Sequence, residues 1–383
     1  MLNIVLDNLN TSNVWFPKKP NCFPWFSKSL VSEPRSSTSK FQQPDHKVTL
    51  PILLYCMENF SIHNSANQLD TFIYPVSMPE PYIQVRSLIA NQNAYGFWSH
   101  VSDSVIEALK EKRGWIIIDL HSEPLGQSDF DDMLVALSDT SVFPNDRILI
   151  NVTSPHFADN KRVFCYPSHL ELGCIMHELY PNLNIINPCP CHRKNLKKLD
   201  YLRKRFLLLS SHRDLPINAI LDKYASKYPN LFLDSANNLE NTFFSSRFLL
   251  LPNALYATDF NIAIEAYLEN NVVEYPFLTE KTLRNIKYKK PFILLGQQST
   301  LAALHKLGYK TFHPFVDESY DEIKDTELRC ATVLRELNRL RKMNDTEWSN
   351  FLDNCKPIVE HNYNNLLRRV NQTRAWLEEL KNL

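Results

Sequence analysis

Apolar runs alternate with amphipathic segments along most of the chain. Short, continuous apolar stretches predict buried strands, and apolar positions recurring every three to four residues predict helices packed against them. Alternation of this kind favours an α/β fold with mostly parallel sheets covered by helices. The predicted strands are 49–56, 115–120, 147–152, 162–166, 183–186, 206–209, 231–233, 248–251, 261–264, 292–295 and 310–312.

The alternation stops and restarts, which predicts two domains. Residues 1–45 are rich in proline and serine and are interpreted as an irregular N-terminal arm. A first Rossmann-like domain follows over 46–190, a basic linker over 191–205 and a second Rossmann-like domain over 206–325. Residues 326–383 form a helical tail, interrupted at Pro357, that we expect to pack back on the body. With two such domains face to face, a ligand site is expected in the cleft between them, at the carboxyl ends of strands.

Composition narrows the class of protein. The 383 residues are 44% hydrophobic and 22% charged, which is typical of a soluble globular protein. No basic, apolar leader opens the chain, no apolar run is long enough to cross a membrane, and the eight cysteines are widely spread. These features predict a cytoplasmic protein with free thiols. Lys plus Arg and Asp plus Glu both number 42, which disfavours binding to nucleic acid through phosphates, although a basic cluster lies within 192–205.

Glycine and cysteine spacing excludes several sites. The chain has only 6 glycines, all too far apart for a dinucleotide fingerprint or a P-loop. A bound phosphate would therefore depend on side chains, isolated amides or helix N-termini. The cluster Cys189-Pro190-Cys191-His192 has no second pair at zinc-site spacing, so no metal is predicted there.

An acid and a base are adjacent in the segment Tyr275-Pro276-Phe277-Leu278-Thr279-Glu280-Lys281. Taken locally, Thr279 caps a helix with Glu280 in its first turn and a solvent-facing Lys281. The order of elements says more. A strand ending at Glu265 precedes the segment, and a Pro-led apolar strand, Pro291 to Gly296, follows it. This arrangement resembles the donor-site segment of fucosyltransferase-like glycosyltransferases, over roughly residues 205–320.

The resemblance implies a GT-B fold, in which two Rossmann-like domains share a nucleotide-sugar donor held mainly by the second. It implies that Lys281 holds a phosphate and that Glu280 and Glu265 accept hydrogen bonds from ribose or sugar hydroxyls. Tyr275 and Thr279 belong to the same donor-binding segment. The Glu-Lys pair replaces a metal in such folds, so no metal or other cofactor is expected.

A shorter stretch, Ser210-Ser211-His212-Arg213, resembles the first strand-to-helix turn of the same donor domain. The resemblance implies that Arg213 is a second cation on the diphosphate and that Ser210 or Ser211 supplies hydrogen bonds. The alternative is a helix start at which Arg213 pairs with a surface acid.

Direct displacement at a sugar carbon needs a base for the acceptor hydroxyl. Asp119, His121 and Glu123 alternate at the end of the strongest predicted N-terminal strand, and Glu58 follows another strand. Each of them can also be a purely structural hydrogen-bonding group. Glu123 is the preferred candidate.

The sequence thus predicts a metal-independent glycosyltransferase with a glycan acceptor. One alternative acceptor is a hydroxymethylated pyrimidine base in phage DNA, since similar sequences occur in phages, and the compartment would then be the host cytoplasm. Another alternative is a GT-B-like binding protein without catalysis. A hydrolase of the α/β type is disfavoured because no Gly-x-Ser-x-Gly elbow is present. Sugar, nucleotide, stereochemistry and oligomeric state are left open.

Overall fold

The structure is a computed structural model of the chain. The residues it describes are 2–5, 60–77, 101–120, 127–128, 130–131, 147–152, 163–164, 204–209, 216–234, 258–265, 267–269 and 275–379. Two compact units divide the chain, the first of Met1–Gly173, Asn182–Ile185 and Val370–Leu383, the second of Cys174–Pro181 and Ile186–Arg369. Each unit contains a parallel sheet, which confirms the predicted α/β class. The strands correct two of the limits predicted for the domains, as described below, and the other limits stay predictions.

The first unit is built on a parallel sheet with the order β2-β1-β3-β4-β5-β6 among the described residues. Three of the strands, β4, β5 and β6, lie within strands predicted from the sequence, and Ile116, Ile117 and Ile118 of β4 are fully buried. Helix α6 (Asp103–Lys110) precedes β4 and buries Val105 and Leu109. The strands are β1 (Leu2–Val5), β2 (Phe60–His63), β3 (Ile73–Ser77), β4 (Trp115–Leu120), β5 (Ile148–Val152) and β6 (Val163–Phe164).

Strand β1 lies inside this sheet, so the prediction of an irregular arm over 1–45 is wrong for residues 2–5. β1 pairs with β2 on one side and with β3 on the other, and Ile4 and Val5 are fully buried. Asn3 breaks the apolar run, and its amide nitrogen donates to the Thr71 carbonyl at 2.9 Å. A four-residue strand that contains an asparagine has too little periodicity to be recognised. The rest of the predicted arm and the strand predicted over 49–56 lie outside the described residues.

The second unit is built on a parallel sheet with the order β10-β9-β7-β8. Its strands are β7 (Lys204–Leu209), β8 (Phe232–Asp234), β9 (Thr258–Ile264) and β10 (Phe292–Leu295). The first strand, β7, has β8 on one side and β9 on the other, so the winding of the chain reverses between β7 and β9. Ligands of open parallel sheets bind at the carboxyl ends of strands at such a reversal.

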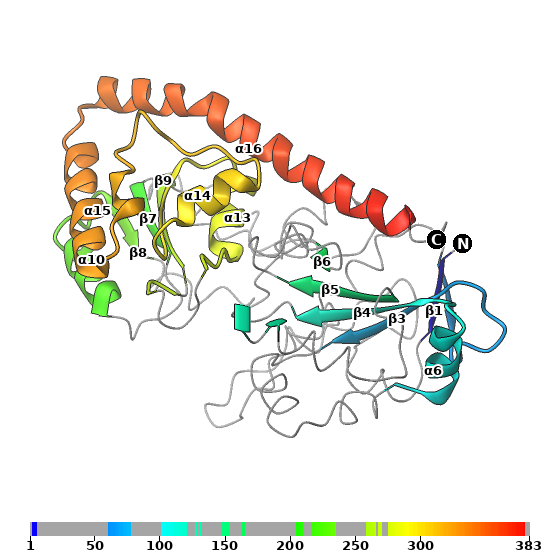
Figure 1. Cartoon of the computed structure of the whole chain (residues 1–383). Helices are drawn as coiled ribbons and strands as arrows, with labels where there is room; N and C mark the ends of the chain where they lie inside the picture. Colours follow the sequence, from blue (N-terminus) through cyan, green and yellow to red (C-terminus); the bar gives the residue numbers. More distant parts are fainter. Residues whose placement is uncertain are drawn as a thin grey trace, which may run out of the picture. The chain divides into compact units, whose positions relative to one another are not determined.

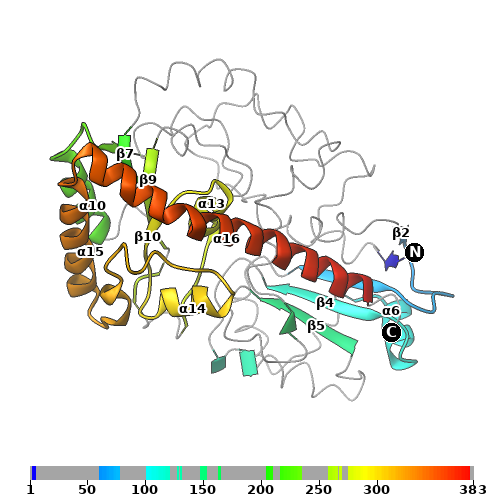
Figure 2. The ribbon, with the colours of Figure 1, turned by 90° about the horizontal axis from the view of Figure 1, so that it is seen from above.

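Helices cover both faces of this sheet. Figures 1 and 2 show it between α10 (Pro216–Ser226) and α15 (Thr326–Arg341) on one side and α13 (Glu280–Lys287) and α14 (Thr300–Lys306) on the other. Aromatic side chains fill part of the core, where the ring of Phe206 stacks on that of Phe232 with centroids 4.9 Å apart and meets Phe260 edge-on at 6.1 Å. These three rings, from β7, β8 and β9, therefore pack together in the core of this unit.

The basic linker predicted over 191–205 is wrong at its end, because Lys204 and Arg205 are the first residues of β7. Arg205 donates to the Met343 carbonyl at 2.6 Å and to the Asp345 carboxylate at 2.7 Å. Its guanidinium also lies over the ring of Trp348, 5.1 Å from the centroid. All three partners are far along the chain, so a local pattern of charges could not indicate them. Residues 191–203 lie outside the described residues.

Helix α14 begins differently from its prediction. Ser299 stands at the N-cap position, but its φ is 66° and its side chain makes no capping bond. Instead, the carboxylate of Asp321, in the 3₁₀ helix Ser319–Glu322, accepts hydrogen bonds from the amides of Leu301 at 3.0 Å and Ala302 at 3.3 Å. The strand predicted at 310–312 is absent there, because the Lys310 backbone bonds to the Asn362 side chain rather than to a strand.

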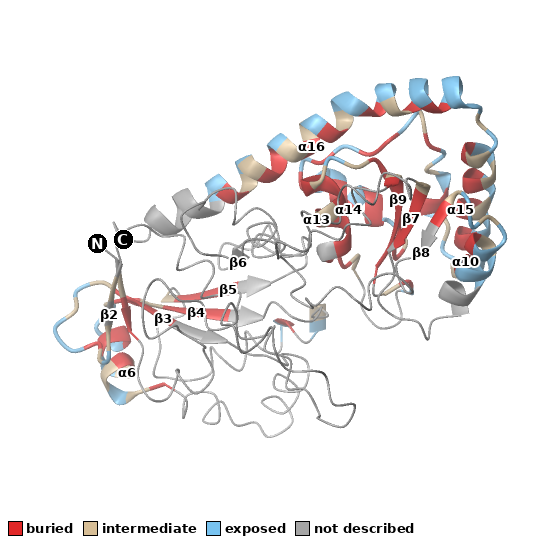
Figure 3. Cartoon of the chain, turned by 180° about the vertical axis from the view of Figure 1, so that it is seen from behind, coloured by how far each residue is buried: buried red, intermediate tan, exposed pale blue. Residues whose placement is uncertain are grey.

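The last part of the chain that the structure describes is helical, as predicted. α15 is capped by Asp325, whose carboxylate accepts from the Leu328 amide at 2.7 Å. α16 (Asp345–Glu379) continues through Pro357, so the predicted interruption is wrong. Figure 3 shows buried and exposed residues alternating along α15 and α16, as expected of helices that pack on one side. Of the helices that the structure describes, none has the length and apolar character of a bilayer span.

Candidate functional site

Glu265 and the start of helix α13, which the sequence predicted as parts of one site, meet at the carboxyl edge of the second sheet. Glu265 directly follows β9, and its amide continues the ladder by donating to the Leu295 carbonyl at 2.9 Å. Helix α13 begins at Glu280, and Thr279 is its N-cap. Leu209, the last residue of β7, pairs with Ala263, two residues before Glu265. The site therefore lies where the winding of this sheet reverses.

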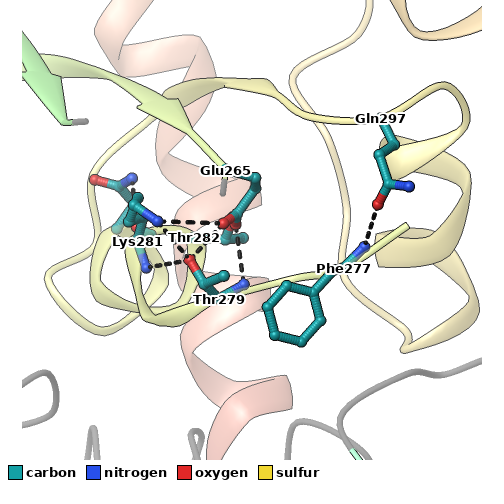
Figure 4. A network of polar contacts seen from close by, with 7 residues as sticks. Glu265, Phe277, Thr279, Lys281, Thr282 and Gln297 are labelled. Atoms are coloured by element: carbon teal, nitrogen blue, oxygen red, sulfur yellow. Dashed lines mark hydrogen bonds and ion pairs between the residues drawn. The ribbon is translucent and has the colours of Figure 1, made fainter. Parts of the chain in front are cut away.

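The Glu265 carboxylate is fully buried and is surrounded by donors. Oε1 accepts from the Thr279 amide at 3.1 Å and from the Thr282 hydroxyl at 2.5 Å. Oε2 accepts from the Thr279 hydroxyl. Figure 4 shows these bonds converging from the N-cap and first turn of α13. With both oxygens engaged and no exposed surface, the carboxylate fixes the start of the helix, which differs from the expected contact with ribose or sugar hydroxyls.

Lys281 is joined to Glu265 through a shared neighbour. Its side chain is 6% exposed, and its Nζ lies 3.9 Å from Glu265 Oε2, a distance for an ion pair but not for a hydrogen bond. Nζ donates instead to Thr279 Oγ1 at 3.2 Å. Because the Thr279 hydroxyl gives its one proton to Glu265, its oxygen is left to accept from Lys281. Among the described residues, Thr279 is the one hydrogen-bond acceptor of this ammonium group, which has three protons to donate.

Charge and burial act against each other at Glu265. Burial raises the pKa of the carboxyl above its ordinary value, while the Lys281 charge and the hydrogen bonds from Thr279 and Thr282 oppose that rise. The result is a buried carboxyl whose ionised form depends on these three neighbours.

A second buried network links β9 to the same helix, and sequence reasoning missed it. The Thr258 hydroxyl donates to Asn261 Oδ1 at 3.0 Å, and the Asn261 amide donates to Asn285 Oδ1 at 2.6 Å. Asn285 in turn donates to the Lys281 carbonyl at 3.0 Å. Thr258, Asn261 and Asn285 are all fully buried. An asparagine between the apolar residues Phe260 and Ile262 was the signal available in the sequence.

Other predicted site residues are placed only in part or not at all. Tyr275 is half-buried at the start of the segment that leads to Thr279. The backbone of Glu280 lies in the first turn of α13, but its side chain is not described. Asp119 lies in β4, opposite Ser77 of β3. The predicted residues outside the described ranges are Ser210, Ser211, His212, Arg213, Glu123, His121 and Glu58.

The sequence predicts that the reaction needs no metal, and this stays a prediction. Among the described residues, no group of three or more His, Cys, Asp or Glu side chains is placed to hold a metal ion. The cluster from Cys189 to His192 lies outside them.

No protein-family model matches the chain, and no curated protein sequence matches it. Among solved structures, the crystal structure of an alpha1,3-fucosyltransferase is similar, with 14% sequence identity and a TM-score of 0.37. The match covers 78% of this chain and 71% of that one. The α/β architecture described above rests on the strand pairings of the chain itself.

Proposed function

We propose that this chain is a glycosyltransferase that moves a sugar from a nucleotide-sugar donor to an acceptor hydroxyl. The observation that carries the proposal is the position of Lys281. Its ammonium lies at the N-terminus of α13, at the carboxyl edge of β9, and is bound there through Thr279 to a buried carboxylate. The sequence around it resembles the donor segment of fucosyltransferase-like enzymes, which supports a GT-B fold with two Rossmann-like domains.

The chemistry of the donor explains why such a lysine is useful. When the bond between sugar and diphosphate breaks, negative charge develops on the leaving phosphate. A cation fixed at a helix N-terminus stabilises that charge, because the helix dipole and amide groups act in the same direction. Fixing the cation beforehand also avoids the cost of ordering it during the reaction.

In this proposal Glu265 and Thr279 are positioning residues. The proton of the Thr279 hydroxyl rests in the bond to Glu265 Oε2, so the hydroxyl oxygen faces Lys281 as an acceptor. The remaining two ammonium protons are then available to phosphate oxygens. Glu265 balances the charge of Lys281 when the donor is absent, at a distance that leaves the ammonium without a direct hydrogen bond to it.

The remaining parts of the mechanism come from the sequence. Arg213 would be a second cation on the diphosphate, and Ser210 and Ser211 would add hydrogen bonds to it. Glu280 would accept from a ribose hydroxyl, and Glu123 would take the proton of the acceptor hydroxyl. With lysine and arginine supplying the positive charge, the reaction needs no metal in this proposal. The acceptor is proposed to be a glycan.

A panel of nucleotides tests the proposal. The wild-type chain is heated with ADP, CDP, GDP, UDP and the matching nucleotide sugars, because a ligand at 100 times its dissociation constant stabilises the folded state by about 2.7 kcal/mol. The nucleotides that carry one of the four bases should raise the melting temperature clearly more than the other nucleotides do. Transfer of a radiolabelled sugar from that donor to glycan acceptors, or to hydroxymethylated DNA, then separates the two acceptor classes. No stabilisation by any nucleotide or nucleotide sugar would contradict the proposal.

A further inference from the structure

Gln297 lies in a tightly constrained turn at the same edge of the second sheet. It follows β10 and is 1% exposed. Its carbonyl accepts from the Thr300 hydroxyl at 2.6 Å. The preceding residue, Gly296, has no room for a side chain, because a Cβ there would lie 2.6 Å from Thr300 Oγ1. The backbone of this turn is therefore fixed against the start of α14.

The amide of Gln297 reaches from this turn to two distant backbone groups. Its Oε1 accepts from the Phe277 amide at 3.1 Å, and its Nε2 donates to the Glu269 carbonyl at 3.3 Å. Glu269 belongs to the segment that leaves Glu265, and Phe277 to the segment that arrives at Thr279. One buried side chain thus ties together the outgoing and incoming parts of the connection between β9 and α13.

Gln297 and Glu265 bind alternate amides of the incoming segment. Gln297 accepts from Phe277, and Glu265 accepts from Thr279, two residues later. In an extended segment, alternate backbone amides point in the same direction. Thr279 has extended backbone, and Figure 4 shows the two side chains reaching the segment at two separate points. Leu278, between the two amides, is fully buried.

We infer that Gln297 is a positioning residue of the donor site, an inference that rests on the proposed function. A single anchor at Thr279 leaves the segment free to turn about that point. The second anchor at Phe277 removes this freedom, so the Thr279 hydroxyl stays directed between Glu265 and Lys281. Phe277 also meets Tyr267 edge-on, with ring centroids 5.8 Å apart, so Gln297 fixes an aromatic pair next to Glu265 as well.

Two variants remove the anchor in different ways. Gln297→Met keeps the length of the side chain and loses both polar atoms. Gln297→Asn keeps an amide but withdraws it by one methylene, beyond reach of the Phe277 amide. Asn362→Leu is the matched control, since Asn362 is also 1% exposed and also binds a backbone amide and carbonyl, those of Lys310, at 2.7 and 2.8 Å.

Two measurements separate this inference from the proposed function. Hydrogen exchange at the Phe277 amide reports the anchor without any ligand, and it should be at least about tenfold faster in both Gln297 variants but unchanged in Asn362→Leu. Titration calorimetry uses whichever of ADP, CDP, GDP and UDP binds the wild-type chain. Affinity should fall by about five- to tenfold in the Gln297 variants, the effect of losing the hydrogen bond from the Phe277 amide, and stay within twofold in the control.

Each possible result supports or contradicts either the proposed function or the positioning role of Gln297. If no nucleotide binds the wild-type chain, the proposed function fails, and the exchange data still decide whether the anchor exists. If a nucleotide binds the wild type and Gln297→Asn equally well, the positioning role is wrong. An equal loss of affinity in Asn362→Leu would also overturn it, because the effect would then be general destabilisation. Should Gln297→Met not fold, Gln297→Asn alone gives the same test.

Discussion

The Lys281 ammonium lies 3.9 Å from the Glu265 carboxylate and is connected to it through the Thr279 hydroxyl. A threonine at this position therefore has two tasks. As the N-cap it accepts from the Lys281 amide at 3.3 Å, and as a bridge it orders an acid and a base that do not bond directly. This explains why a charged pair can be buried where a strand edge meets a helix start.

The bridge can be tested at Thr279 itself. Thr279→Ser keeps the hydroxyl and should retain most sugar transfer, whereas Thr279→Val keeps the shape and removes it. The valine variant leaves a Glu265 oxygen and a Lys281 proton without partners, which costs about 1–3 kcal/mol of folding free energy. Misdirecting Lys281 should also lower kcat/KM by about tenfold or more. Urea unfolding and initial-rate kinetics measure the two effects, and equal rates for the two variants would contradict the bridge.

Stability should depend on pH through the buried carboxyl groups of the second unit. Burial raises the pKa of Glu265 and Glu318 above 4.5 and that of Asp321 above 3.8. A carboxyl with a raised pKa binds its proton more tightly when folded. The stabilisation of the folded state by this tighter proton binding is therefore complete below the ordinary pKa of the carboxyl. It is lost as the pH rises through the raised pKa.

Glu265→Gln isolates one of these groups, because it removes the titration and nearly preserves the shape. The free energy of unfolding in urea, taken as wild type minus variant, should fall as the pH rises from 4.5 through the raised pKa of Glu265. Other losses caused by the substitution are the same at every pH and cancel from the slope. Parallel curves for the two proteins would show that Glu265 keeps an ordinary pKa.

Arg329 is a second buried cation of this unit, and it binds backbone carbonyl groups. It is 1% exposed and donates to the Ile323 carbonyl at 2.5 Å and to the Leu268 carbonyl, three residues after Glu265. Arg329→Lys replaces a planar fork of donors by a single ammonium, so we expect a loss of about 2–4 kcal/mol of unfolding free energy. The half-exposed Arg339, paired with Glu336 at 2.5 Å, is the control, and Arg339→Lys should cost less than about 1 kcal/mol. Similar losses in both variants would contradict this difference.

Pro357 should destabilise α16. It is exposed in the interior of the helix and has no amide proton for a helical hydrogen bond. Pro357→Ala should therefore raise the unfolding free energy by about 1–3 kcal/mol. Part of this increase is offset, because the unfolded chain has more conformational freedom with alanine than with proline. A melting temperature that stays the same or falls would mean that the helix depends on the proline.

The sequence was sufficient to predict an element or a cluster where one local pattern, such as a continuous apolar run, was clear. Continuous apolar runs gave β4 and β10 with the observed bounds. The order of acid, aromatic segment and Thr-Glu-Lys triplet brought Glu265, Thr279 and Lys281 together as one cluster. What it did not give was the direction of the hydrogen bonds, which makes Glu265 an internal partner of Thr279 rather than an exposed acceptor.

Failures occurred where tertiary partners decide the conformation. Leu2–Val5 form a strand because strands on both sides pair with it, and nothing in the four residues indicates those neighbours. Ser299 was expected to cap α14, but Asp321, more than twenty residues later, does so. Gln297 and Asn261 were missed for the same reason, since a buried amide acquires its role from distant backbone and side-chain groups.

Lys281 provides the most direct test of the account. Single-turnover sugar transfer from the stabilising nucleotide sugar should be measured for wild type, Lys281→Ala and the control Lys356→Ala, in which an exposed lysine of α16 loses its ion pair with Asp353. The account predicts that Lys281→Ala remains folded by circular dichroism and loses transfer by about 10²–10³-fold, while the control equals wild type. Unchanged transfer by folded Lys281→Ala would contradict the central claim.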